Sequence, residues 1–137
     1  MSTAGYSGTP LPQKLGIKAG SRVALLDAPD GFDQTLGPLP DDVVVRRRLQ
    51  GPLDVVVLFT TERADLERRF DRVVQALDQA GMFWVAWPKK ASKVPTDITE
   101  NVVRDVALPK GLVDTKVAAV DDTWSGLRLV IRKELRH

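Results

Sequence analysis

The sequence of 137 residues predicts one α/β domain with a single open, mostly parallel sheet of about six strands and crossover helices. Three short, almost wholly apolar runs, at 21–28, 54–60 and 82–87, are typical of strands buried on both faces. Two longer segments, 62–79 and 98–107, carry apolar residues at helical spacing and alternate with the strands. We therefore expect the three apolar strands to be parallel and interior.

The N-terminal part divides into a tail, residues 1–20, and the start of the domain, which spans 21–137. A Pro-Asp-Gly turn at 29–31 stops the first strand, and a second, shorter strand is expected at 43–45. Only residues 46–53 separate this strand from the third, whereas a parallel crossover needs about a dozen residues. The short link favours an antiparallel second strand and leaves its direction open.

The segment 62–79 is the clearest helix of the sequence. A single apolar stripe runs along it and is formed by Leu66, Phe70, Val73, Val74 and Leu77. Thr60 or Thr61 is the candidate N-cap, and Gly81 is the expected stop at the C-terminal end. The run 82–87 contains no polar side chain, so its strand is expected at the centre of the sheet.

The C-terminal third predicts a helix followed by a pair of strands. The helix at 98–107 has Asp97 as its expected N-cap, with Glu100 three residues later, close to a capping box. The strands at 112–120 and 126–132 are joined by a short turn, which predicts an antiparallel pair. Apolar and polar residues alternate in the second of them, as is typical of an edge or antiparallel strand.

The composition excludes several kinds of chemistry. Cysteine is absent and the only histidine is His137, which excludes disulfides, thiolate metal sites, a cysteine nucleophile and His-bearing catalytic triads. A formal net charge of +2 is too balanced to indicate nucleic acid or a membrane surface. No apolar run approaches the ~20 residues of a membrane span, and no secretory signal is recognisable. We therefore expect a cytoplasmic protein without a metal ion, a nucleic-acid partner or a membrane partner.

From Asp54 onward the sequence resembles the C-terminal half of Rossmann-like S-adenosylmethionine-dependent methyltransferases. The resemblance rests on an Asp-led apolar strand, an amphipathic helix that leads through Gly81 into the next apolar strand, and a further helix with Gly111 before a final strand pair. It implies a methyltransferase-like sheet whose last two strands form an antiparallel hairpin.

The N-terminal half departs from that family where the cofactor is held. The family has a glycine-rich loop and a full helix after its first strand, whereas the turn at 27–31 contains one glycine. About fourteen residues then precede the second strand, although a complete dinucleotide-type unit needs about 30. The second strand runs into three arginines at 46–48 rather than a carboxylate that could hold ribose hydroxyls. The resemblance therefore implies a truncated methyltransferase-like domain, and we expect no cofactor.

The whole chain also resembles a family of small bacterial proteins, mainly actinobacterial, known as domain of unknown function 3052. The matching stretches are YSGTPL at 6–11, KLGIKAGSRVALL at 14–26, WVAWPKKAS at 84–92, PTDITE at 95–100 and WSGLRLV at 124–130. This resemblance covers nearly all of the chain and implies no activity.

Candidate ligand-binding residues gather where the predicted strands end, since open α/β sheets bind ligands beyond the carboxyl ends of their strands. The candidates are two tryptophans, two lysines, two serines and an aspartate: Trp87, Lys89, Lys90, Ser92, Asp121, Trp124 and Ser125. We expect their two segments to end adjacent strands and, because of the lysines, to attract an anionic ligand. The alternative is a solvated loop with idle lysines and tryptophans that only pack.

Three functions remain open from the sequence. The favoured one is a non-catalytic methyltransferase-like domain, with no catalytic residue, that binds a small anionic ligand or a protein partner. The second is a working S-adenosylmethionine-dependent methyltransferase with a reshaped pocket, in which Asp27, Asp30 and Gly31 lie near the cofactor. The third is an assembly subunit, with a possible homo-oligomer, that docks through the tail segment 6–11.

Overall fold

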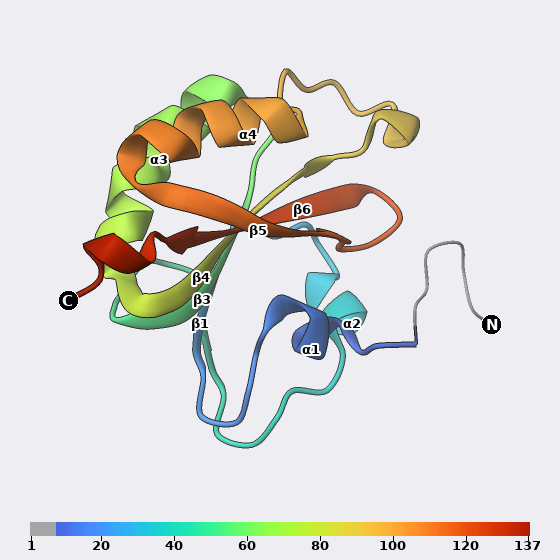
Figure 1. Ribbon diagram of the computed structural model, residues 1–137. Helices are drawn as coiled ribbons and strands as arrows, with labels where there is room; N and C mark the ends of the chain where they lie inside the picture. Colours follow the sequence, from blue (N-terminus) through green and yellow to red (C-terminus); the bar gives the residue numbers. More distant parts are fainter. Residues whose placement is uncertain (1–7) are drawn as a thin grey trace.

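The computed structural model describes residues 8–137, so the first seven residues of the predicted tail lie outside the described part. Within 8–137 one sheet is formed by β1 (Arg22–Leu26), β2 (Val44–Arg46), β3 (Leu53–Phe59), β4 (Leu77–Pro88), β5 (Leu112–Ala119) and β6 (Trp124–Ile131). The α-helices are α1 (Leu11–Leu15), α2 (Phe32–Leu36), α3 (Arg63–Ala76) and α4 (Glu100–Ala107). Short 3-10 turns are η1 (Lys90–Ser92), η2 (Leu108–Lys110) and η3 (Lys133–Leu135). The predicted α/β class is confirmed (Figure 1).

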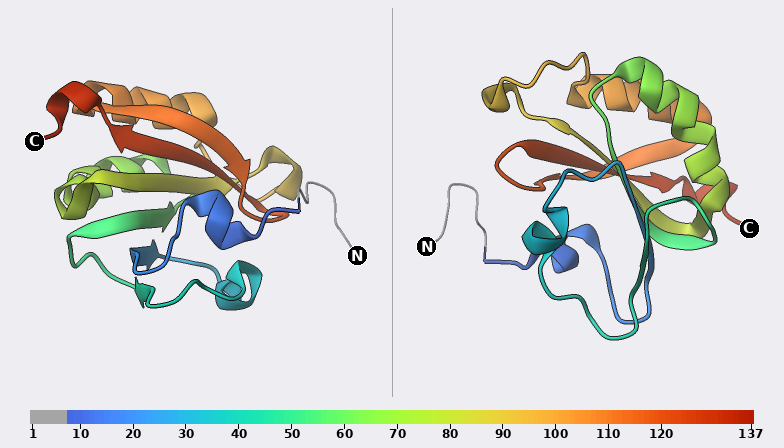
Figure 2. Two further views of the ribbon diagram at one scale, coloured as in Figure 1. Left: turned by 60° about the horizontal axis from the view of Figure 1, so that its bottom comes forward. Right: turned by 180° about the vertical axis from the view of Figure 1, so that it is seen from behind.

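The strands of the sheet follow the order β2-β1-β3-β4-β6-β5 (Figure 2). As predicted, β1, β3 and β4 are interior and parallel to one another. β6 runs antiparallel between β4 and β5, so the C-terminal hairpin places its second strand beside β4 and leaves β5 at the edge. This is the truncated methyltransferase-like arrangement implied by the resemblance.

The second strand is parallel to its neighbour, with Val44 beside Arg22 of β1, so the antiparallel direction favoured by the sequence is wrong. The reason is that β2 pairs with β1 and lies two positions away from β3 in the sheet. The link 47–52 has to cross two strand spacings, together about 10 Å, and six extended residues reach about 20 Å. Because β2 has only three residues, this link returns to the start of β3 without a helix.

Helices cover both faces of the sheet (Figure 1). α3 and α4 lie on one face, where the ring of Phe70 packs 5.2 Å from that of Phe83. α1 and α2 lie on the other face, where Leu15, Phe32 and Leu36 join the buried core. No helix within residues 8–137 is long and apolar enough to cross a membrane.

Part of the predicted tail packs against the sheet. Leu15 and Ile17 are buried, and Trp84 Nε1 donates a hydrogen bond of 2.9 Å to the carbonyl oxygen of Leu15. The turn after α1 requires glycine, because Gly16 has a φ of 86° and a Cβ there would lie 2.4 Å from Met82 Cε. From Leu11 onward the described residues therefore contribute to the core.

The predicted end of the long helix needs correction. α3 ends at Ala76, and Leu77 already begins β4. Gly81 is therefore no helix stop; it is buried within β4, where an added Cβ would lie 2.9 Å from the carbonyl oxygen of Leu53. The glycine is required by the close approach of two strands.

The predicted helix caps need correction as well. Thr99 caps α4, since its side chain accepts a hydrogen bond of 3.2 Å from the amide of Val102. Asp97, the predicted cap of α4, instead accepts a hydrogen bond of 2.7 Å from the amide of Arg63 at the start of α3. The N-cap position of α3 is Glu62, not a threonine, and the two helices are tied together at their N-termini.

Candidate functional site

The carboxyl ends of β1 and β3 frame a topological switch point. The chain leaves β1 toward α2 on one face of the sheet and leaves β3 toward α3 on the other (Figure 1). Open α/β sheets bind ligands in the crevice outside such a point. The first residues beyond the two strands here are Asp27 and Thr60.

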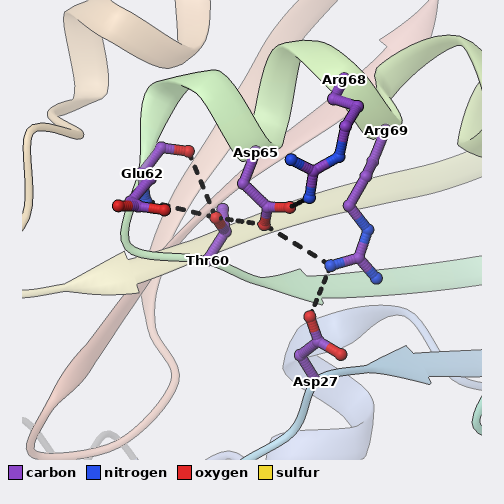
Figure 3. Close-up of polar contacts among 6 residues, drawn as sticks. All are labelled: Asp27, Thr60, Glu62, Asp65, Arg68 and Arg69. Carbon is purple, nitrogen blue, oxygen red and sulfur yellow. Dashed lines mark hydrogen bonds and ion pairs between the residues drawn. The ribbon is translucent and has the colours of Figure 1, made fainter.

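An ion-pair network crosses this crevice (Figure 3). Arg69 reaches across from α3, with Nη1 2.5 Å from Asp27 Oδ2 and 3.5 Å from Asp65 Oδ2. Thr60 Oγ1 donates a hydrogen bond of 2.8 Å to Asp65 Oδ2, and Arg68 Nη2 lies 2.5 Å from Asp65 Oδ1. The Arg69 side chain thereby bridges the end of β1 and the first turns of α3.

The loop after β1 is a tight turn. Asp27 has a φ of 58° and Gly31 a φ of 79°, and the chain then enters the five-residue α2. Phe32 at the start of α2 is buried, and its ring meets the ring of Phe59 edge-on at 4.9 Å. Of the residues predicted near a cofactor, Asp27 is held in the ion pair, while Asp30 and Gly31 are exposed.

The structure brings together the seven candidate residues at the end of β4, which we call the lysine edge: Trp87, Lys89, Lys90, Ser92, Asp121, Trp124 and Ser125. They meet because β6, antiparallel to β4, begins where β4 ends; Trp87 lies opposite Ser125. The amide of Lys89 donates a hydrogen bond of 2.7 Å to the carbonyl oxygen of Thr123. The expected adjacency of the strands that end these segments is wrong, because β6 lies between β4 and β5.

The side chains of the lysine edge have different roles. Ser92 Oγ donates a hydrogen bond of 2.7 Å to the carbonyl oxygen of Lys89, and Asp121 Oδ1 accepts hydrogen bonds of 2.8 Å from two amides of its own turn. Trp87 is 7% exposed, and Trp124 packs edge-on against an aromatic ring of the core. Among the described residues, neither Lys89 nor Lys90 forms an ion pair. The ammonium groups of Lys89 and Lys90 are therefore available to meet a ligand.

A concave region, the arginine cleft, lies beside α3. It is a cavity of about 670 Å³ lined by Leu26, Arg47, Arg48, Leu49, Arg69, Arg72, Gln75 and Ala76. Arg47 also lines a neighbouring cavity of about 290 Å³, where Asp33 holds it at 2.7 Å. Arg69 lies at the boundary between two regions. Its side chain lines the arginine cleft and also crosses the switch point.

The sequence did not reveal the arginine cleft. If residues 46–48 all belonged to a strand, successive arginines would point to opposite faces of the sheet. β2 ends at Arg46, however, so this alternation does not extend to the next two arginines. Arg47 and Arg48 therefore line the same cavity. A partial signal was available in α3, where Arg69 and Arg72 are spaced to share one face of the helix.

A cation site has no support in the described residues. Asp121 and Asp122 are adjacent in sequence, but within residues 8–137 no group of three or more acidic or histidine side chains could hold a metal ion. The Asp121 carboxylate is already engaged by the amides of Thr123 and Trp124.

The fold is shared with solved structures, several of which are described as methyltransferases. TrmN from Thermus thermophilus has a TM-score of 0.56 and 12% identity, over 89% of this chain and 47% of that one. The fibrillarin pre-rRNA processing protein of Methanococcus jannaschii has a TM-score of 0.61 and 10% identity, over 90% and 69%. Magnesium protoporphyrin IX methyltransferase of Synechocystis PCC 6803, solved with bound SAM, has a TM-score of 0.56 and 9% identity, over 89% and 74%.

These likenesses concern the fold alone, and the chain spans about half of TrmN. In sequence, the family described as "Protein of unknown function (DUF3052)" matches residues 13–133. No curated protein matches the chain.

Proposed function

We propose that this chain, which belongs to the DUF3052 family of proteins of unknown function, is a non-catalytic methyltransferase-like domain that binds a small anionic ligand at the carboxyl edge of its sheet. The observation that carries the proposal is the pair of lysines, Lys89 and Lys90, that follow the end of β4 and form no ion pair within residues 8–137. They place uncompensated positive charge at the edge where an open α/β sheet receives its ligand.

S-adenosylmethionine, the cofactor that the fold suggests, does not fit the residues present. It would supply a methyl group from a positively charged sulfonium centre, and the switch point, where it would lie, is crossed by the Arg69–Asp27 ion pair. The loop carrying Asp27 is a tight turn into a single-turn helix. At the end of β2, where a carboxylate would hold ribose hydroxyls, the Arg46 guanidinium donates to Gln50 Oε1 at 3.1 Å. No catalytic step is therefore derived through this cofactor.

The lysine edge supports an anionic ligand. Lys89 and Lys90 project two unpaired ammonium groups from the end of a buried strand, and Trp87 and Trp124 lie beside them. Two like charges close together are costly unless solvent or an anion compensates them. A small carboxylate or phosphate would do so, and the nearby indoles would report its arrival.

The first test is titration calorimetry with S-adenosylmethionine. We expect binding no tighter than about 1 mM, which corresponds to about −4 kcal/mol. The matched variant is Arg69→Ala, which removes the bridging side chain and leaves Asp27 in place. A micromolar dissociation constant for the parent protein would favour the alternative function, a methyltransferase with a reshaped pocket.

The second test is a thermal-shift screen with nucleotides, S-adenosyl compounds and acidic metabolites. A ligand present at 100 times its dissociation constant adds about 2.7 kcal/mol to the free energy of unfolding. We expect an acidic compound to stabilise the protein and to change tryptophan fluorescence, and we expect the Lys89→Ala/Lys90→Ala variant to lose both responses. A variant that keeps the full response would remove the lysine edge from the proposal.

A further inference from the structure

We propose that the arginine cleft is a binding site for an organic phosphate, a ligand with about two negative charges on a phosphate or diphosphate group and an apolar body. The site adjoins the switch point, with which it shares the side chain of Arg69, and is separate from the lysine edge. The inference goes beyond the proposed function and does not depend on it.

The cleft exists because one face of the sheet lacks a helix beside α3. The link 47–52 crosses this face without helical structure, so the flank of α3 that carries Arg69 and Arg72 stays open. At one end of the cleft the link touches α3. A Cβ added at Gly51 would lie 2.4 Å from the carbonyl oxygen of Ala76. The link therefore lies directly against the last turn of α3 at this end of the cleft.

The charge of the cleft is unbalanced in favour of cations. Four of its eight lining residues are arginines, and no carboxylate is among them. Arg47 is oriented by Asp33 at 2.7 Å, and Arg69 by Asp27 at 2.5 Å. Among residues 8–137, the guanidinium groups of Arg48 and Arg72 form no ion pair. About two positive charges in the cleft thus have no carboxylate partner, whereas the formal net charge of the whole chain is only +2.

The shape and lining of the cleft suit a small organic molecule. Its volume of about 670 Å³ falls within the range of about 300–1,000 Å³ that is usual for ligand pockets. Leu26, Leu49 and Ala76 supply the apolar part of the lining, which we call the apolar floor. A planar guanidinium presents paired N–H donors that match two oxygens of a phosphate, so arginines around an apolar floor select an organic phosphate.

The test compares four probes by titration calorimetry at 50 mM salt: ADP, pyrophosphate, adenosine and a 12-nucleotide single-stranded DNA. We expect ADP to bind, pyrophosphate to bind about tenfold more weakly because it lacks an apolar body, and adenosine not to bind. The Arg48→Ala/Arg72→Ala variant should lose at least about tenfold in affinity for ADP. The charge-matched control, Lys116→Ala/Arg132→Ala, removes two exposed cations outside the cleft and should change that affinity less than about twofold.

Each other outcome overturns the inference. If neither ADP nor pyrophosphate binds below about 5 mM, the arginines only cover the apolar floor with their stems. Equal losses in the cleft variant and in the control would show a non-specific charge effect. Tighter binding of the DNA strand than of ADP would indicate a nucleic-acid surface instead. The Lys89→Ala/Lys90→Ala variant separates the two proposals, because ADP binding that depends on these lysines belongs to the lysine edge.

Discussion

The two halves of the sheet differ in the length of their strands and in the helices that accompany them. The complete half consists of β3, β4, β6 and β5, with 7, 12, 8 and 8 residues, and α3 and α4 cover one of its faces. The short half consists of β1 and β2, with five and three residues, joined through the five-residue α2. The largest buried side chains, among them Trp84, Phe70 and Phe83, lie in the complete half.

The difference separates stability from recognition. The complete half keeps the packing that holds a methyltransferase-like sheet together; a Cβ added at Gly126 would lie only 3.0 Å from the ring atom Cε3 of Trp84. The short half carries the positions where ligands of open α/β sheets bind, and there the chain has a tight turn, an arginine bridge and an arginine cleft. Changes in the buried core of the complete half should therefore affect unfolding, whereas changes in the charged side chains at the carboxyl edge of the sheet should affect binding.

The largest effect is expected from truncation of the core of the complete half. Phe70→Ala removes a fully buried ring that packs on Phe83 and should lower the free energy of unfolding by about 3–5 kcal/mol. The control in the short half is Val44→Ala, at an edge-strand position that is 44% exposed, with a loss below about 1 kcal/mol. Urea denaturation measures both, and equal losses would contradict the division between the halves.

A smaller effect is expected where glycine permits close approach. Gly81→Ala forces a Cβ against the carbonyl oxygen of Leu53 within the complete half and should cost about 2 kcal/mol. Gly31→Ala in the short half meets no atom within 4 Å and should cost only the strain of a positive φ, about 1 kcal/mol. Thermal unfolding of the two variants checks the order, and a larger loss at Gly31 would reverse the comparison.

The complete half was predictable from the sequence because its signals are local. Unbroken apolar runs mark β3 and β4, and the stripe of Leu66, Phe70 and Val73 marks α3. The predictions that are wrong for this half concern the boundaries of its helices and strands. Gly81 has the spacing of a helix stop, but the chain already pairs as a strand from Leu77. The glycine is needed because the backbone of Leu53 lies close to it in the neighbouring strand.

The short half was harder to predict because its features depend on tertiary placement. The direction of β2 follows from its position on the far side of β1, which the length of the link 47–52 alone does not reveal. By contrast, the lysine edge, at the end of β4 in the complete half, could be assembled from strand ends, which are a local signal. The arginine cleft could not, since its walls come from a link and a helix that meet only in the folded chain.

Acid should weaken the contact that joins the two halves. Arg22 of β1 holds Asp54 of β3 through two side-chain hydrogen bonds of 3.0 Å, and this hydrogen bonding lowers the pKa of Asp54 below its ordinary value of 3.8. Likewise, hydrogen bonding to Arg104 lowers the pKa of Asp114 within the complete half. A lowered pKa in the folded state gives stability that is present above the ordinary value and is lost as pH falls below it.

The expected result is a loss of unfolding free energy as the pH falls through about 4 and below. Asp54→Asn should cost about 1 kcal/mol at pH 7, since solvent screens a carboxylate that is 34% exposed, and should flatten the acid dependence. Urea denaturation from pH 7 to pH 3 measures the free energy of unfolding at each pH. The control is Asp30→Asn, which removes an exposed carboxylate. An unchanged acid slope in Asp54→Asn would show that this ion pair does not contribute to the acid dependence of stability.

The smallest effects on stability are expected from the charged side chains of the two proposed binding surfaces, and they should still differ. Lys89→Ala/Lys90→Ala removes unpaired ammonium groups and should change the free energy of unfolding by less than about 0.5 kcal/mol. Arg48→Ala/Arg72→Ala should cost slightly more, about 0.5–1 kcal/mol, because arginine stems cover the apolar floor at Leu26 and Leu49. Urea denaturation of both variants in the same buffer resolves the difference. A loss of several kcal/mol in either variant would mean that its cations hold the fold together, and a loss of binding there would then report unfolding rather than recognition.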